Sequence, residues 1–449
     1  MIALALLVIL AQPAHGRRAV RQDVTFAEGI TRSRFDLSGT PDTRPDAPLF
    51  SFAVPPPGYK GYGSSYAGLP AADGCYDPSL VTGTKGEALT FTRATTRFCP
   101  TSTNEATGVM CASGEVCITS SGTTRGISIF RAGTNIALRS QEFDNAGAWA
   151  LANSGASAVS REANSADCGA APDGTQTAEK ITIPDVASEQ YSLMYQVIAT
   201  TATGHSRSLW MKKLSGASIV NTHVWNATTG YTSQTAHTVT TSWARYSKAN
   251  VTLAASDTYH YIGTDARAAT AAESASSAIV VCVWGFQSEA SPYVTPYVAT
   301  TSASATRNAE TATFPITFSG NVISTAATLA LRKATLSLGV VSLHSSFPAG
   351  GPNYLSYVTT GGLMSVYSAG AEHATFDPSS FFTTSDRVAS YCTGAASGNI
   401  WNGNTTAGTN CGSLSTGNAV LAVGWFTSAT QADAIVSDVC VDTASTRCR

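Results

Sequence analysis

The chain has 449 residues, a formal net charge of −2 and only 12% charged side chains, against roughly 25% in an ordinary soluble domain. This charge lacks the positive excess typical of proteins that bind nucleic acid or an anionic membrane surface, so that class of function is excluded. The 43% hydrophobic content excludes a disordered chain, and the length allows two to four domains at roughly 150 residues each.

The first sixteen residues, MIALALLVILAQPAHG, form a short apolar run followed by small residues. This run is too short to span a bilayer and has the size of a signal-peptide core. Residues 1–16 are therefore predicted to be a cleaved signal peptide, with a retained N-terminal anchor as the alternative. Residues 17–85 are rich in proline and glycine and lack periodicity, which predicts a flexible arm or linker.

Short β-type runs begin near residue 86, and turn clusters rich in Gly, Ser, Asn, Asp and Thr separate them. Many short strands with regular turn signals indicate sandwiches or barrels rather than βαβ units. The strands expected in the first module are residues 190–199, 206–213, 217–225, 244–253, 258–264 and 278–287. Strand patterning restarts after residue 311, so the predicted modules are residues 86–311 and 312–449.

The predicted fold class is all-β, with tandem jelly-roll or concanavalin A-like β-sandwiches after a flexible N-terminal arm. Residues 91–97, FTRATTR, are echoed by residues 305–311, ATRNAET. The echo indicates that the two modules are entered in a similar way.

Ten cysteines without a CxxC pair favour disulfides over zinc or redox chemistry, given an export signal. Sequence alone does not fix their connectivity. The predicted pairs are Cys75–Cys99, Cys111–Cys117, Cys168–Cys282, Cys392–Cys411 and Cys440–Cys448.

Several motifs occur in an order that is similar to that of a known family. They are FTRATTRFC (91–99), ISIFRAGTNIALRSQEFDNAGAWA (127–150), APDGTQTAEK (171–180), SLWMK (208–212), TSWARY (241–246), WGFQSE (284–289), TPYVAT (295–300) and ATR (305–307). Their order resembles tailed-phage and prophage structural proteins of the tail-fibre or minor-tail type. The resemblance covers about residues 89–311, and it implies a carbohydrate-binding-like jelly roll followed by a laminin-G-like sandwich.

Two features depart from that family. A signal-like N-terminus and ten cysteines are unusual for virion proteins, which assemble in a reducing cytoplasm. Three interpretations follow: the chain is a prophage-derived module that a bacterium exports, its hydrophobic start has a use other than export, or it is a virion protein of an unusual host.

Catalytic motifs are scarce, because the sequence has no GxSxG, HExxH, P-loop or GxGxxG motif on a strand–helix unit. No enzymatic activity is predicted. Sugar binding needs only aromatic faces and hydrogen-bonding side chains. The predicted ligand-binding residues are His223, Trp225, Asn226 and Tyr231 in the first module and Trp401, Asn402 and Asn404 in the second.

By contrast, Trp210, Trp243, Tyr246 and Trp284 stand in strand motifs and are predicted to be core. No cofactor is predicted apart from a structural calcium ion, for which loop carboxylates are available on Asp173, Glu289 and Asp377.

The predicted function is non-catalytic recognition of a cell-surface or extracellular glycan by a secreted or virion protein of the tail-fibre, receptor-binding type. Other virion proteins are further expected partners, and nucleic acid is not. A fibre role would fit a homo-oligomer, although coiled-coil heptads are absent. The alternatives are a purely structural decoration or adhesin-like surface protein and, third, a glycan-degrading enzyme.

Overall fold

The structure is a computed structural model. It describes residues 69–318 except 71, 82–87, 103–104, 122–123 and 268–277, and elsewhere the strands at 50–51 and between 323 and 442. Side chains are described as far as residue 315. The signal peptide and most of the arm predicted for residues 17–85 lie outside the described residues.

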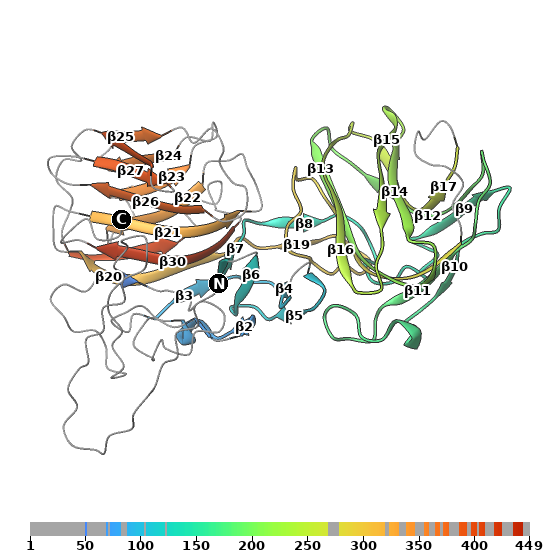
Figure 1. The fold of residues 1–449 in the computed structure, drawn as a ribbon, viewed down its shortest axis with the longest axis horizontal. Coiled ribbons are helices and arrows are strands. Elements are labelled where there is room, and N and C mark those ends of the chain that lie inside the picture. The colour runs from blue at the N-terminus through green and yellow to red at the C-terminus, as the bar shows by residue number, and fades with distance from the viewer. Residues whose placement is uncertain are drawn as a thin grey trace, which may run out of the picture.

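The central module consists of two five-stranded antiparallel sheets, which lie on the right of Figure 1. Its strands are β9 (Ala150–Ser154), β10 (Ser160–Glu162), β11 (Glu179–Ile183), β12 (Tyr191–Ala199), β13 (Gly204–Gly216), β14 (Ile219–Asn226), β15 (Gly230–Thr238), β16 (Ala244–Thr252), β17 (Asp257–Asp265) and β18 (Ile279–Glu289). The sheet orders are β10-β11-β18-β13-β16 and β15-β14-β17-β12-β9.

The strand pairs of this module are nested. The hairpin β14–β15 is innermost, and the pairs β13–β16, β12–β17 and β11–β18 follow outward, alternating between the two sheets. A long antiparallel ribbon folded over in this way is a jelly roll. The predicted all-β class and the predicted jelly roll are therefore confirmed.

Alternation along each strand creates the core between the two sheets, because every second side chain faces the opposite sheet. Met194, Ile198 and Ile262 come from one sheet and meet Leu209 and Val281 from the other, all almost fully buried. In the same core the ring of Trp149 contacts those of Phe143 and Phe286, with centroids 4.8 and 5.1 Å apart.

The residues predicted to be core include the tryptophans of the strand motifs. Trp210 and Trp284 are fully buried, in a second cluster with Phe98 and Tyr297. Trp243 and Tyr246 are only partly buried, against the second cluster and the sandwich core respectively.

His260 of β17 is a buried polar residue in the jelly roll, with its ring 5.9 Å from that of Phe286 and neither ring nitrogen hydrogen-bonded. Burial, reinforced by the positive charge of Arg207 and by His205, lowers the pKa of His260 to about 3. Between pH 6.5 and pH 3 the imidazole of His260 is therefore protonated in the unfolded chain but neutral in the folded protein. The free energy of unfolding consequently decreases as the pH falls from 6.5 towards 3.

We expect the free energy of unfolding of the wild type, relative to His260→Leu, to decrease by about 1.4 kcal/mol per pH unit across that window. Urea unfolding of both proteins between pH 8 and pH 3.5 measures this difference. A difference that does not change with pH would contradict the assignment of a neutral, buried imidazole.

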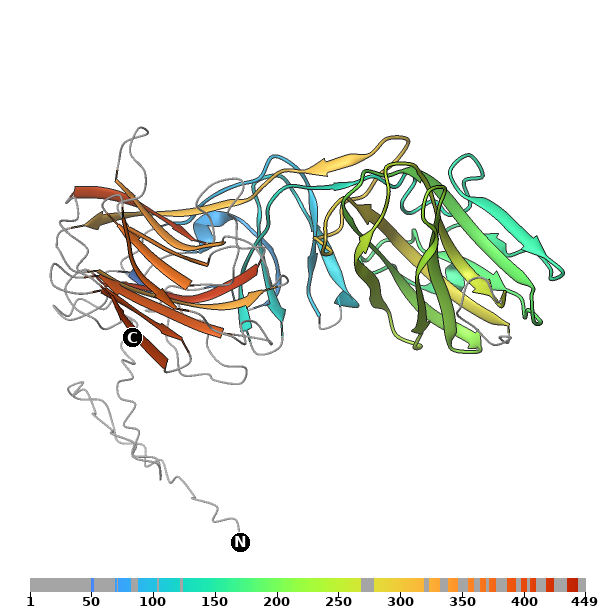
Figure 2. The same ribbon diagram turned by 90° about the horizontal axis from the view of Figure 1, so that it is seen from above.

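The carboxy-terminal part forms two further antiparallel sheets, on the left of Figure 1. Its strands are β20 (Thr311–Phe318), β21 (Ile323–Leu331), β22 (Leu338–Ser345), β23 (Tyr354–Val358), β24 (Met364–Ser368), β25 (Ala371–Phe376), β26 (Asp386–Cys392), β27 (Ser397–Trp401), β28 (Asn404–Gly408), β29 (Gly417–Val423) and β30 (Ala434–Asp442). Figure 2 shows the two sheets as separate layers.

Strands that precede the jelly roll in sequence complete these carboxy-terminal sheets. They belong to a group formed by β1 (Phe50–Ser51), β2 (Gly74–Tyr76), β3 (Thr90–Thr92), β4 (Arg97–Pro100), β5 (Gly108–Cys111), β6 (Val116–Ser121) and β7 (Thr124–Ile129). β3 pairs with β20, β1 and β7 pair with β30, and β2 joins through β6. The chain enters and leaves the jelly roll on a two-stranded ribbon, β8 (Gly133–Asn135) paired with β19 (Ala305–Arg307).

The echoed segments FTRATTR and ATRNAET meet at a buried ionic cluster. Both oxygens of Glu310 lie 2.7 Å from Nη1 of Arg97, and Oε1 lies 2.9 Å from Nη1 of Arg93. Arg307 donates to the carbonyls of Phe130 and Arg131 beside them. These three arginines and Glu310 are at most 2% exposed, and the carboxylate of Glu310 is shared by the guanidiniums of Arg93 and Arg97 in the interior.

Three disulfides are present among the described residues: Cys75–Cys111, Cys99–Cys117 and Cys168–Cys282. The predicted Cys168–Cys282 bridge is confirmed. The predicted pairs Cys75–Cys99 and Cys111–Cys117 are wrong. The sulfurs of Cys75, Cys99 and Cys111 lie within 4.8 Å of one another, so the fold, not closeness in sequence, selects the partners.

The other two predicted bridges, Cys392–Cys411 and Cys440–Cys448, lie outside the side chains that the structure describes.

Candidate functional site

The outer face of the sheet β15-β14-β17-β12-β9 carries a group of aromatic side chains. On β12, β14 and β17 the even-numbered residues Met194, Val220 and Ile262 enter the core, so the odd-numbered residues point away from it. Several of those residues are aromatic, and four of them form, together with Tyr231 of β15, what we call the aromatic face. Its members are Tyr195, Trp225, Tyr231, Tyr259 and Tyr261, all partly exposed.

The register of the paired strands aligns the side chains of the aromatic face in rows that cross the sheet. Tyr259 pairs with Trp225, and Trp225 pairs with Tyr231, so one row crosses β17, β14 and β15 and continues to Val197 on β12. At about 4.8 Å between neighbouring strands, four strands span roughly 14 Å. Tyr195 and Tyr261 form a second row beside the first.

The rings of the aromatic face support one another. The ring centroid of Tyr259 lies 5.1 Å from that of Trp225 and 5.5 Å from that of Tyr195, and the Tyr195 and Tyr261 rings are 5.4 Å apart. Such tilted and edge-to-face contacts are the favoured aromatic geometries. The face is therefore a pre-formed apolar platform whose rings need little reordering to receive a flat ligand.

A charged pair closes one end of this platform. The guanidinium of Arg267 forms two hydrogen bonds, of 2.9 and 2.6 Å, with the fully buried carboxylate of Asp265. The same guanidinium lies over the rings of Tyr191, at 4.0 Å, and Tyr231, at 5.2 Å. This end offers ionic and hydroxyl groups next to apolar rings.

The four residues predicted in this module occupy three different settings. Trp225 and Tyr231 lie on the aromatic face. His223 is on the same side of the sheet, where it pairs with Tyr261, but it is only 1% exposed, with its ring stacked 4.7 Å from that of Tyr261. Burial lowers the pKa of His223 to about 4 despite the opposing charge of Asp265, so the imidazole is neutral at pH 7.

Asn226 corrects the expectation that it would line a ligand surface. Its side chain is fully buried and points to the opposite side of the sheet. The amide nitrogen donates to Thr258 Oγ1 and the carbonyl of Ala254, and the amide oxygen accepts from the backbone nitrogens of Thr228 and Thr229. Asn226 therefore holds the turn between β14 and β15.

Tyr195, Tyr259 and Tyr261 are members of the face that were not predicted from the sequence. The available signal was the Tyr-x-Tyr spacing of residues 259–261, which places both rings on one side of a strand. Tyr195 gives no such signal, because only its pairing with Tyr261 brings it onto the face.

The predicted residues of the second module lie at one hairpin. Trp401 ends β27 and pairs with Asn404, which begins β28. Their side chains and residue Asn402 lie outside what the structure describes.

The carboxylates considered for calcium have partners within the protein. Glu289 is buried and accepts from the backbone nitrogen and the hydroxyl of Thr295, at 2.9 and 2.6 Å. Asp173 accepts from the backbone nitrogen and hydroxyl of Thr175. Asp377 lies outside the described residues.

Within the described part of the chain, no helix has the length and hydropathy needed to cross a membrane. No protein-family model matches the sequence. No curated protein matches it either.

Three solved structures are similar at low scores. The tandem CBM22 domains of Paenibacillus barcinonensis Xyn10C are 11% identical, with a TM-score of 0.25 over 70% of this chain and 99% of that one. The extracellular region of zebrafish Gpr126 is 11% identical (TM-score 0.20; 59% of this chain, 35% of that one). Mouse laminin alpha1 domains LG4-5 are 12% identical (TM-score 0.21; 58% and 88%).

Proposed function

We propose that this chain is a non-catalytic glycan-binding protein and that the aromatic face of the jelly roll is its contact surface. The observation that carries the proposal is the continuous row of Tyr259, Trp225 and Tyr231 on the outside of one sheet. Flat apolar rings stack on the apolar faces of sugar rings, and nearby polar groups bind the hydroxyls. Arg267, whose side chain is 24% exposed, supplies such a group at the end of the row, held in place by Asp265.

The disulfides support a location outside the cytoplasm, because disulfides persist in oxidising compartments. We propose a secreted or virion-associated protein that binds a cell-surface or extracellular glycan. The motif order that resembles phage tail-fibre proteins supports the receptor-binding version of this role, including assembly with other virion proteins or as a homo-oligomer.

Replacing Trp225 by alanine is expected to weaken glycan binding by roughly 30-fold, about 2 kcal/mol, because a central aromatic contact is removed. Affinity is measured by titrating the wild type and the variant with a glycan selected on an array. Trp243→Ala is the matched control, since Trp243 packs on the other sheet and its indole donates to the carbonyl of Ala170.

Equal loss in Trp225→Ala and Trp243→Ala would point to general destabilisation and contradict the site. Absence of any glycan binding by the folded, oxidised protein would favour a purely structural role. The hairpin bearing Trp401, Asn402 and Asn404 remains a second proposed site, which Trp401→Ala tests in the same titration.

A further inference from the structure

Four cysteines lie together where the strands before the jelly roll meet. Cys75 of β2, Cys99 of β4, Cys111 of β5 and Cys117 of β6 form one cluster, in which the bridges Cys75–Cys111 and Cys99–Cys117 are neighbours. The sulfurs of Cys75, Cys99 and Cys111 lie within 4.8 Å of one another. The sulfur of Cys99 is therefore close to both sulfurs of the other bridge.

The same backbone permits a second pairing of these four residues. Cys75 and Cys117 are direct cross-strand partners in β2–β6. Such partners have Cα atoms about 4.5–5.5 Å apart, within the range of about 4.4–6.8 Å that disulfides span. Cys99 pairs with Val109, two residues before Cys111, so Cys99 and Cys111 lie on the same side of the hairpin β4–β5. The pairs Cys75–Cys117 and Cys99–Cys111 are therefore compatible with this fold.

The two pairings differ in what they connect. In the observed pairing both bridges join the hairpin β4–β5 to β2 and β6, which belong to one of the carboxy-terminal sheets. The hairpin itself is a separate two-stranded sheet. In the second pairing Cys99–Cys111 would lie within the hairpin and Cys75–Cys117 within β2–β6. Neither of these bridges would then join the hairpin to the carboxy-terminal sheet.

The hairpin β4–β5 carries a contact with the jelly roll, and Figure 1 shows it between the two modules. Phe98, next to Cys99, packs against Trp210 with ring centroids 5.2 Å apart. In the turn of the hairpin, the carbonyl of Glu105 accepts from the indole of Trp210 at 2.6 Å, and the Glu105 carboxylate lies 3.0 Å from Arg245. The observed bridges therefore anchor to the carboxy-terminal sheet a hairpin that holds the jelly roll.

The sulfur of Cys75 is the one most open to a thiol from solution. Cys75 is partly exposed, whereas Cys99, Cys111 and Cys117 are fully buried. Thiol–disulfide exchange begins with the attack of a thiolate on an accessible sulfur of a bridge. Attack at Cys75 releases the thiolate of Cys111 beside the sulfur of Cys99.

We propose that Cys75 is a site of attack by a small-molecule thiol and that the attack converts the cluster to the second pairing. The thiolate forms a mixed disulfide with Cys75 and breaks Cys75–Cys111. The Cys111 thiolate then attacks Cys99, which forms Cys99–Cys111 and releases the Cys117 thiolate. Finally Cys117 attacks Cys75, which forms Cys75–Cys117 and releases the thiol. Three bonds form and three break, so the exchange involves no net oxidation or reduction.

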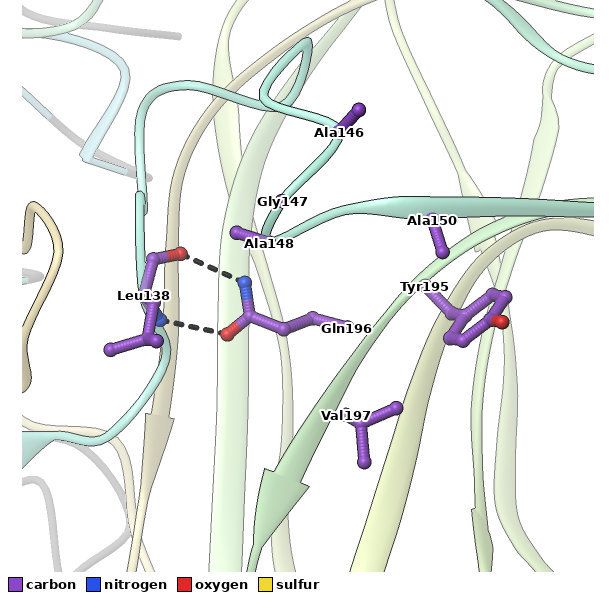
Figure 3. A pocket seen from close by; sticks show the side chains of 8 residues that line it. All are labelled: Leu138, Ala146, Gly147, Ala148, Ala150, Tyr195, Gln196 and Val197. Atoms are coloured by element: carbon purple, nitrogen blue, oxygen red, sulfur yellow. Dashed lines mark hydrogen bonds between the residues drawn. The ribbon is translucent and has the colours of Figure 1, made fainter.

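The jelly roll has ties of its own that do not involve the hairpin. The bridge Cys168–Cys282 joins η3 (Ala166–Cys168) to β18. Beside the aromatic face, Gln196 accepts from the backbone nitrogen of Leu138 at 2.7 Å and donates to its carbonyl at 2.8 Å, as Figure 3 shows. The exchange therefore alters how this module is anchored and leaves its own fold in place.

The test treats the full oxidised chain with a substoichiometric amount of glutathione, blocks the thiols with N-ethylmaleimide and then digests the protein. Trypsin and a glutamate-specific protease together place the four cysteines on separate peptides, residues 61–85, 98–105, 106–115 and 116–125. Mass spectrometry of the linked peptides then identifies each pair. The buried bridge Cys168–Cys282 is the internal control.

We expect the pairs Cys75–Cys117 and Cys99–Cys111 to appear with glutathione and to be absent without it, while Cys168–Cys282 is retained. In Cys75→Ala the unpaired Cys111 thiol is expected to displace Cys117 without added thiol, so N-ethylmaleimide should label both Cys111 and Cys117. Retention of only the observed pairs in the treated wild type, or label on Cys111 alone in the variant, would overturn the exchange.

Amide hydrogen exchange tests the effect on the anchoring of the hairpin. Residues 98–111 of the glutathione-treated protein are expected to exchange at least about tenfold faster than in the untreated protein, because the bridges that restrain the hairpin are lost. β12 of the jelly roll should exchange at an unchanged rate. Equal rates for residues 98–111 in a protein that has changed its pairing would show that the bridges do not anchor the hairpin.

Discussion

Replacing Glu310 by alanine is expected to destabilise the protein by about 3–5 kcal/mol, enough to unfold the region where the two modules meet. Breaking a buried ion pair on one side leaves an uncompensated charge in the interior, which is why the effect is large. Here the charge left behind is that of the buried guanidiniums of Arg93 and Arg97, which both contact Glu310. The pKa of Arg97 is already lowered to about 9, chiefly by burial.

The change in stability can be followed by urea unfolding of the wild type, Glu310→Ala and Glu310→Gln. The glutamine variant keeps the shape of the side chain but not its charge. Glu142→Ala is the control, because Glu142 pairs with Arg139 at the surface, where both side chains are at least one-third exposed. Such a surface pair is worth 0–1 kcal/mol. An effect of Glu310→Gln as small as that of Glu142→Ala would show that the cluster contributes little.

Removing the Cys168–Cys282 bridge is expected to lower the free energy of unfolding by about 5 kcal/mol, more than either of the other described bridges. It joins η3 (Ala166–Cys168) to β18 and closes a loop of 114 residues. A longer loop means a larger loss of entropy in the unfolded chain when the bridge forms. For the 18-residue separation of Cys99 and Cys117 the same relation gives about 3 kcal/mol.

The comparison pairs Cys168→Ala/Cys282→Ala with Cys99→Ala/Cys117→Ala in thermal and denaturant unfolding. Both bridges are buried, so the loss of packing on substitution is similar. The reverse order of stability would mean that loop entropy does not set the contribution of these bridges.

Strands could be predicted from the sequence where a local pattern of apolar and polar residues determines them. Six expected strands of the jelly roll correspond to β12, β13, β14, β16, β17 and β18 within three residues at each end. β15 was not predicted, because its sequence GYTSQTAHT is polar on both sides and carries no alternation. Its place in the sheet comes from the tight turn that Asn226 holds and from pairing with β14.

Long-range pairing could not be predicted in the same way. The bridge Cys75–Cys111 depends on how three strand pairs, β2–β6, β4–β5 and β6–β7, meet. The aromatic face was predicted only in part for the same reason. Trp225 and Tyr231 flank one turn and are close in sequence, whereas Tyr195 joins them only through the register of β12 with β17.

The pairing of early strands with late ones has a consequence for how the chain is made on the ribosome. β7 ends at Ile129 and its partner β30 begins at Ala434, so the first strands of the carboxy-terminal sheets are synthesised long before their partners. The jelly roll, which begins and ends on the β8–β19 ribbon, can fold during that interval. Until translation is nearly complete, β7 and the other early strands lack their partners and present unpaired edges to other chains. A chaperone that covers such edges would therefore raise the yield of folded protein.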